Sequence, residues 1–168
     1  MKKGTPIKGI PQEYASSVGD IVTRWSYIES TLRDTAYAIL GIGPKEGRIA
    51  VREPRAKEYV LMLKELVELK KIKLSGDLKK LADSIEDFNR LRDWLAHSVW
   101  VTMDDNVYLQ VISGKWRPPK SHKSVSRRIT PQGVLMRPEE LTELIDLLKS
   151  LTASVESMRN QVKASLKS

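Results

Sequence analysis

The residues best suited to chemistry in this sequence stand within six consecutive positions, Arg92-Asp93-Trp94-Leu95-Ala96-His97. A histidine side chain has an unperturbed pKa of ~6.5, so His97 can accept or donate a proton near neutral pH. The guanidinium of Arg92 offers a planar fork of N–H donors that matches the non-bridging oxygens of a phosphate. Together these two side chains suit acid–base chemistry on a phosphate ester.

The spacing of Arg92 and His97 sets a geometric condition on that chemistry. On an unbroken helix, two residues five positions apart point about 140° away from each other. They converge if the helix ends between them, and the β-type run from Val99 indicates such an end, with His97 on the exit turn. Alternatively, two copies of the segment meet across a dimer.

Arg92 also interrupts an apolar pattern. The helix expected at about 77–96 carries an apolar stripe at steps of three or four residues, formed by Leu78, Leu81, Ile85, Phe88 and Leu95. Arg92 occupies the position that would continue this stripe after Phe88. Because an unpaired arginine in an apolar core costs several kcal/mol, Arg92 needs a carboxylate partner or an opening to solvent. Glu29, on the first predicted helix, is a candidate partner.

A basic segment follows His97. Residues 106–138 contain no Asp or Glu, and their aromatic Trp116 can stack on a base. The residues predicted to bind nucleic acid are Lys115, Trp116, Arg117, Lys120, Lys123, Arg127 and Arg128. Such a segment is either an electrostatic footprint for a polyanion or a solvated loop, and its place shortly after His97 favours RNA.

The composition also favours a polyanionic partner. Among 168 residues, 29 Lys and Arg stand against 21 Asp and Glu, a formal net charge of +8, which favours nucleic acid first and an anionic membrane second. The absence of cysteine excludes disulfides and thiolate metal sites, and two histidines make a zinc site improbable. We expect no metal and no cofactor. No apolar run reaches the length of a signal peptide or a membrane span, so we expect a cytoplasmic protein.

Four helices are expected to position these residues. Apolar periodicity predicts helices over about 13–40, 54–72 and 77–96, and a last helix from Pro138. The last helix has the most regular seam, formed by Leu141, Leu144, Leu148, Leu151, Val155, Met158 and Val162. Such a seam requires helical neighbours in this chain or in a second one.

The remaining segments complete the expected architecture. The β-rich runs 99–103 and 107–112 predict a β-hairpin, which together with the basic loop spans 99–130. Residues 1–11 hold two glycines and two prolines and predict a loose N-terminal arm. The predicted fold class is therefore all-α: one domain over 1–168, an up-and-down bundle of four main helices, with the hairpin and basic loop inserted between the third and fourth.

The string Arg92-Asp93-Trp94-Leu95-Ala96-His97 closely resembles the RxxxxH signature of the HEPN superfamily, in which Arg, a polar residue, two variable residues, often Ala, and His close a helix. The run Trp25–Leu32 and the opening Pro138-Glu139-Glu140-Leu141 are similar to helices of HEPN families. This resemblance implies an all-helical bundle that commonly dimerises, with the motifs of two protomers lining one cleft. Many members are metal-independent endoribonucleases that act as toxins or in antiviral defence, whereas others only bind nucleotides or partners.

For this chain the resemblance implies that a ribose 2′-hydroxyl of RNA attacks the adjacent phosphate. His97 would move the proton and Arg92 would hold the charge of the phosphorane, which leaves a 2′,3′-cyclic phosphate and a 5′-hydroxyl. Asp93 stands where the family often has Asn, and it would repel a phosphate unless it is paired with Arg92, His97 or a lysine. Two roles for Asp93 stay open: it supports catalysis by orienting His97, or its charge marks a weakened site. The implied partners are RNA, a second copy of the chain, and an antitoxin or inhibitor protein.

Two other interpretations of the same residues stay open. In the first, the chain is a non-catalytic HEPN-like module that binds RNA, a nucleotide or a partner protein through the basic loop and the seam of the last helix. In the second, it is a plain helical scaffold in which Arg92 forms a buried ion pair with Glu29, and both Arg92 and His97 are replaceable.

Overall fold

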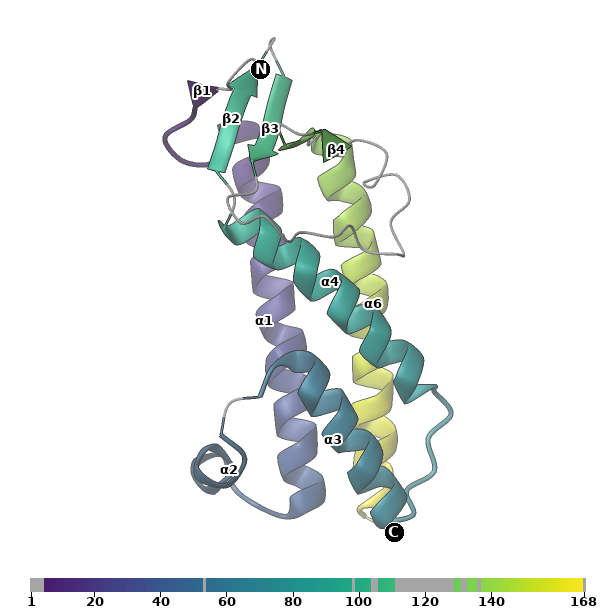
Figure 1. Cartoon of the computed structure of the whole chain (residues 1–168). Helices are drawn as coiled ribbons and strands as arrows, with labels where there is room; N and C mark the ends of the chain where they lie inside the picture. Colours follow the sequence, from purple (N-terminus) through teal and green to yellow (C-terminus); the bar gives the residue numbers. More distant parts are fainter. Residues whose placement is uncertain are drawn as a thin grey trace. The chain divides into compact units, whose positions relative to one another are not determined.

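The structure is a computed structural model that describes residues 5–52, 54–97, 99–103, 106–110, 129–130, 133–135 and 137–167. Within these ranges the chain forms five helices and five short strands (Figure 1). The helices are α1 (Gln12–Leu40), α2 (Pro44–Val51), α3 (Ala56–Leu69), α4 (Leu78–His97) and α6 (Pro138–Ser165). The strands are β1 (Thr5–Pro6), β2 (Val99–Met103), β3 (Asn106–Gln110), β4 (Ile129–Thr130) and β5 (Gly133–Leu135). The predicted mainly helical character is confirmed.

The four long helices begin and end within a few residues of the predicted limits. The eight-residue α2 was not predicted, because it is too short for a periodic apolar pattern and has a glycine, Gly47, in its middle. Pro44 stands in its first turn, where a fixed φ favours helix and the missing N–H is not needed.

The chain divides into two compact units. The first contains Met1–Val22 and Asp87–Leu147, and the second contains Thr23–Glu86 and Leu148–Ser168. The unit boundaries therefore fall within α1, α4 and α6. The single domain expected from the sequence stays a prediction.

The first unit contains an antiparallel sheet in the order β1-β2-β3-β5-β4. The predicted hairpin is confirmed, since Met103 pairs with Asn106 and Val99 with Gln110. The N-terminal arm is not wholly loose, because Thr5 pairs with Thr102 at the sheet edge, where a neighbouring proline is tolerated. Likewise, the last two residues of the predicted loop 113–130 form β4, which pairs with β5.

The second unit has its own apolar core. Its part of α1 buries Trp25, Ile28 and Leu32 completely. Hydrogen bonds reach α6 from elsewhere in the unit: the Tyr27 hydroxyl donates to Oε1 of Glu156 over 2.6 Å, and the backbone N–H and the hydroxyl of Ser75 both donate to Oε1 of Gln161, over 2.8 and 3.2 Å.

The predicted apolar seam of α6 is confirmed at every position. All seven of its members are buried, namely Leu141, Leu144, Leu148, Leu151, Val155, Met158 and Val162. An unbroken three-four spacing therefore identified the inward face of this helix from sequence alone.

Candidate functional site

Helix α4 carries Arg92, Asp93 and His97, and its first turn is capped by the chain itself. Oδ1 of Asp77 accepts hydrogen bonds from the backbone N–H groups of Lys79, at 2.9 Å, and Lys80, at 3.1 Å. These bonds satisfy N–H groups that have no partner within the helix. Because they stabilise the carboxylate, the bond from Lys80 first, the pKa of Asp77 is lowered.

Arg92 does not occupy a core position of α4, and that prediction is wrong. The apolar stripe continues from Phe88 to Leu91 and then to Leu95, and these side chains are only 1%, 1% and 2% exposed. A step of three residues after Phe88, rather than four, keeps the stripe on one face of the helix. Arg92 therefore lies beside the stripe, with its side chain 26% exposed.

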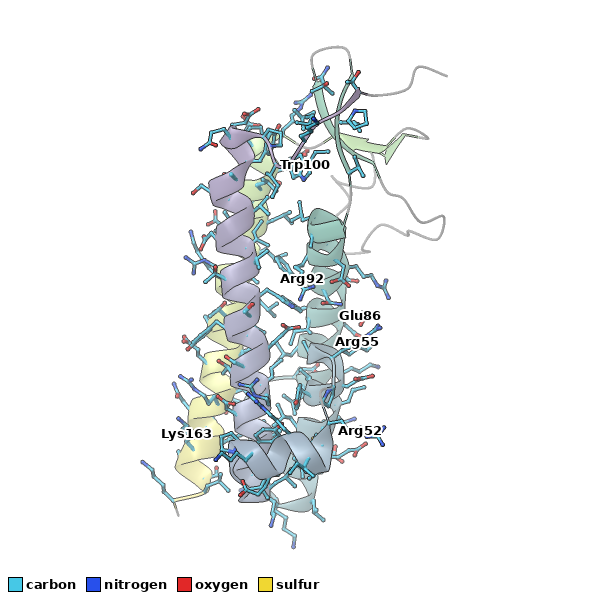
Figure 2. All side chains as sticks on the ribbon, turned by 90° about the vertical axis from the view of Figure 1, so that its left-hand side faces the viewer. Arg52, Arg55, Glu86, Arg92, Trp100 and Lys163 are labelled. Atoms are coloured by element: carbon cyan, nitrogen blue, oxygen red, sulfur yellow. The ribbon has the colours of Figure 1, made fainter. Side chains whose placement is uncertain are left out.

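Arg92 is paired with the next residue in the chain. Nη1 of Arg92 donates to Oδ1 of Asp93 over 2.8 Å, and Nδ2 of Asn89 donates to the other oxygen, Oδ2, over 3.3 Å (Arg92 is labelled in Figure 2). Of the partners considered for Asp93 from the sequence, namely Arg92, His97 or a lysine, the structure shows Arg92. Asn89 was missed, although its spacing of four residues from Asp93 is the signal for such an amide–carboxylate pair.

His97 was expected to approach Arg92 within one chain because the helix would end between them. The backbone does not end the helix there. Helix α4 includes His97 as its last residue, and β2 begins at Val99. Because the helix does not end between the two residues, their positions differ by about 140° around the helix axis. The side chains of His97 and Trp94 lie outside the described part of the chain.

The exit from α4 is anchored through Trp100. The rings of Tyr14 and Trp100 lie 5.0 Å apart between centroids, tilted by 48°, and Trp100 is buried (labelled in Figure 2). The carbonyl of Trp100 also accepts a hydrogen bond from the Ile7 N–H over 2.8 Å. Trp100 is thus a core residue, as Trp25 is in the second unit. Since Trp100 follows His97 by three residues, these contacts fix the direction in which the chain leaves the site.

Acidic residues in the first turns of α1 and α6 influence the hydroxyl of Tyr14. Burial raises the pKa of Tyr14, and the negative charges of Glu13 and Glu139 add to this effect. At the start of α6 the backbone N–H of Arg137 donates to Oε2 of Glu140 over 3.0 Å, one half of a capping box.

The described structure does not test the other predicted site residues. Lys115, Trp116, Arg117, Lys120, Lys123, Arg127 and Arg128 lie outside the described residues. Glu29 belongs to the second unit and Arg92 to the first, so their pairing stays a prediction. Among described residues, no group of three or more His, Cys, Asp or Glu side chains is arranged to hold a metal ion.

Comparisons of the chain with protein-family models, with curated proteins and with solved structures find no match. Within the described ranges, no helix has both the length and the apolar character needed to cross a membrane. On α4 itself, Arg92 is a partly exposed donor, held by Asp93, that can bind an anionic oxygen. His97, at the end of the same helix, is of the residue type that moves protons near neutral pH.

Proposed function

We propose that this chain is a metal-independent endoribonuclease of the HEPN type. The observation that carries the proposal is the arrangement on α4. The partly exposed Arg92 donates a hydrogen bond to the carboxylate of Asp93, and His97, five residues after the arginine, is the last residue of the helix. An arginine fixed in this way is suited to recognise phosphate, and RNA supplies its own nucleophile, the ribose 2′-hydroxyl. The protein then needs only to move protons and to stabilise charge.

In the proposed reaction, His97 removes the proton from the 2′-hydroxyl as its oxygen attacks the adjacent phosphorus. The guanidinium of Arg92 stabilises the negative charge on the non-bridging oxygens of the phosphorane. The bond to the 5′-oxygen then breaks, and that oxygen takes up a proton. The products are a 2′,3′-cyclic phosphate and a 5′-hydroxyl.

We further propose that the site is shared between two copies of the chain. Positions 92 and 97 of one copy lie about 140° apart around the axis of an unbroken α4, which favours a phosphate contact shared with a second copy. In a symmetric dimer, Arg92 of one copy and His97 of the other can face the same phosphate, and symmetry creates two such sites.

The finer features of the fold belong to the same proposal. The four long helices would form an up-and-down bundle, and the basic loop with Lys115, Trp116 and Arg117 would bind RNA beside the site. The protein would act in the cytoplasm as a toxin or in antiviral defence, controlled by an antitoxin or inhibitor protein.

One observation favours a second candidate, a non-catalytic module that binds RNA, a nucleotide or a partner protein. The carboxylate of Asp93 pairs with Arg92 and offsets its charge, which weakens the attraction of this site for phosphate. Such a module would bind RNA with an affinity that falls steeply with salt, but it would not cut the strand.

Cleavage of a mixed RNA substrate in EDTA separates the two candidates. The purified chain is compared with His97→Ala, and circular dichroism checks that both are folded. Scission by the wild type alone, leaving cyclic phosphate ends, supports the ribonuclease. Binding of RNA by both proteins without scission supports the non-catalytic module.

A further inference from the structure

Helix α2 has one face turned inward and one turned to solvent. Gly47 is buried, and a Cβ added to it would lie 2.5 Å from ring atoms of Tyr37 on α1. Val51, one turn later, is half-buried. The glycine therefore allows α2 to approach α1 closely, and the Gly47–Val51 side is the attached face of this helix.

The opposite side of α2 is basic. At about 100° per residue, Lys45 and Ile49 fall on the side away from Gly47, and Arg48 and Glu46 lie at the two edges of that side, each about 100° from Gly47. We name Lys45, Arg48, Ile49 and Arg52, the non-helical residue that caps the helix, the α2 outer face. All four are exposed, as is Glu46, and Ile49 is 84% exposed. In the part of the chain that the structure describes, its three cations form no ion pair.

The backbone at Arg52 adds an independent observation. Its φ of 61° and ψ of −148° lie in a region that is essentially reserved for glycine. Strain of this kind is concentrated at binding and catalytic sites. It holds an exposed arginine at the end of the outer face, three residues before the exposed Arg55 that precedes α3 (Arg52 and Arg55 are labelled in Figure 2).

We propose that the α2 outer face binds the phosphate backbone of single-stranded nucleic acid. The proposal rests on the proposed function for its ligand, since it makes this surface a second contact for the RNA that is cut at α4. Two arginines and a lysine outnumber the one carboxylate of α2, that of Glu46, and are complementary to a row of phosphates. An anionic membrane is less well matched, because Ile49 is the single strongly exposed apolar side chain of α2, and membrane anchoring needs a larger buried apolar area.

The test measures binding of a fluorescent, uncleavable 2′-O-methyl RNA of about 20 nucleotides, long enough to span several phosphate contacts. The full-length chain is compared with the triple variant Lys45→Gln/Arg48→Gln/Arg52→Gln over a range of salt concentrations. We expect the slope of log affinity against log salt to fall by about 2, since each phosphate contact to a single strand contributes about 0.7. Glutamine at position 52 is subject to the same backbone strain as arginine, so the change isolates charge.

The matched control is Lys70→Gln/Lys71→Gln/Lys73→Gln. It removes three exposed cations from the same unit, one of them, Lys71, also at positive φ. The proposal requires a much smaller change of slope in this variant. Equal changes in the two triple variants, or none in either, would overturn it. If the outer-face triple variant does not fold, Arg48→Gln alone must lower the slope by about 0.7.

Three further arms identify the ligand. A DNA of the same sequence should bind with a similar slope, because only phosphates are contacted. Vesicles containing an anionic phospholipid should not bind through this face, and their capture by the wild type but not by Ile49→Ser would overturn the proposal in favour of a membrane. Because the RNA probe cannot be cut, binding is measured whether or not the α4 site is catalytic. His97→Ala should lose cleavage but bind the probe as the wild type does. This result separates the proposed ribonuclease site on α4 from the proposed binding surface on α2.

Discussion

Nη1 of Arg92 lies 2.8 Å from Oδ1 of Asp93, so the arginine proposed to bind phosphate already holds a carboxylate. The pair is partly exposed, with 26% of the arginine and 48% of the aspartate side chain accessible. A phosphate that approaches Arg92 must therefore compete with Asp93 or share the guanidinium with it. In the proposed ribonuclease, this competition would make the level of activity adjustable at a single residue.

The first prediction concerns that carboxylate. Replacing Asp93 by Asn should lower the KM for RNA severalfold, because it removes a negative charge from beside the phosphate site. Stability should change by less than about 1 kcal/mol, the usual range for an exposed ion pair. Steady-state cleavage in EDTA measures the first effect and thermal unfolding the second. Asp87→Asn removes the same charge from α4 and should leave KM unchanged. A fall in kcat for Asp93→Asn would instead show that the carboxylate is needed to orient His97.

The second prediction concerns the anchor of the chain beyond α4. Trp100→Ala should destabilise the chain by about 3–5 kcal/mol, because it removes a buried ring that packs on Tyr14. Chemical denaturation followed by far-ultraviolet circular dichroism measures the loss. Trp100→Phe retains an aromatic ring and should recover most of it. Equal loss in the two variants would mean that the ring contact with Tyr14 is not the source of the stability.

The third prediction concerns the attachment of α2. Gly47→Ala should cost about 1–3 kcal/mol of stability, since its methyl group would overlap the ring of Tyr37. Gly19→Ala is the matched control: this glycine is an exposed residue inside α1, and an added Cβ there meets nothing within 4 Å. The control should stabilise the chain by about 0.5–1 kcal/mol through helix propensity. Stabilisation by both substitutions would show that α2 does not lie against Tyr37 as described.

The fourth prediction follows from the pKa of Asp77. Its folded pKa lies below the ordinary value of 3.8, chiefly because the Lys80 N–H donates to its carboxylate. The charged cap therefore stabilises the fold above that ordinary pKa, and this stabilisation is lost as the pH falls through the lowered folded value. Asp77→Asn keeps a capping side chain without the charge. Thermal unfolding should show the variant less stable than the wild type at neutral pH, with the difference closing at acid pH. A difference that is constant with pH would rule out the charge as its cause.

Much of the helical framework could be predicted from the sequence, because a long amphipathic helix repeats its signal many times. The seam from Leu141 to Val162 is an example, since every member is buried. The error at Arg92 arose where the repeat permits two continuations. After Phe88 a step of four reaches Arg92 and a step of three reaches Leu91, and only packing against neighbouring elements selects Leu91.

Other features depend on contacts between residues far apart in the sequence. The pairing of Thr5 with Thr102 has no local signal, because a strand of two residues is too short for an alternating pattern. The close approach of Gly47 to Tyr37 is likewise set by the connection between α1 and α2. Within the site, the Asn89–Asp93 pair is local and was open to prediction from its spacing.

The most direct test of the account is to mix two inactive variants. Arg92→Ala and His97→Ala are purified separately, checked for folding, and then refolded together so that subunits exchange. If each site takes Arg92 from one copy and His97 from the other, half of the dimers contain one intact site, and about a quarter of the wild-type cleavage in EDTA should return. If the mixture is as inactive as its components while the wild type cuts RNA, the shared site is contradicted. If the wild type itself leaves RNA intact, the ribonuclease is contradicted as well.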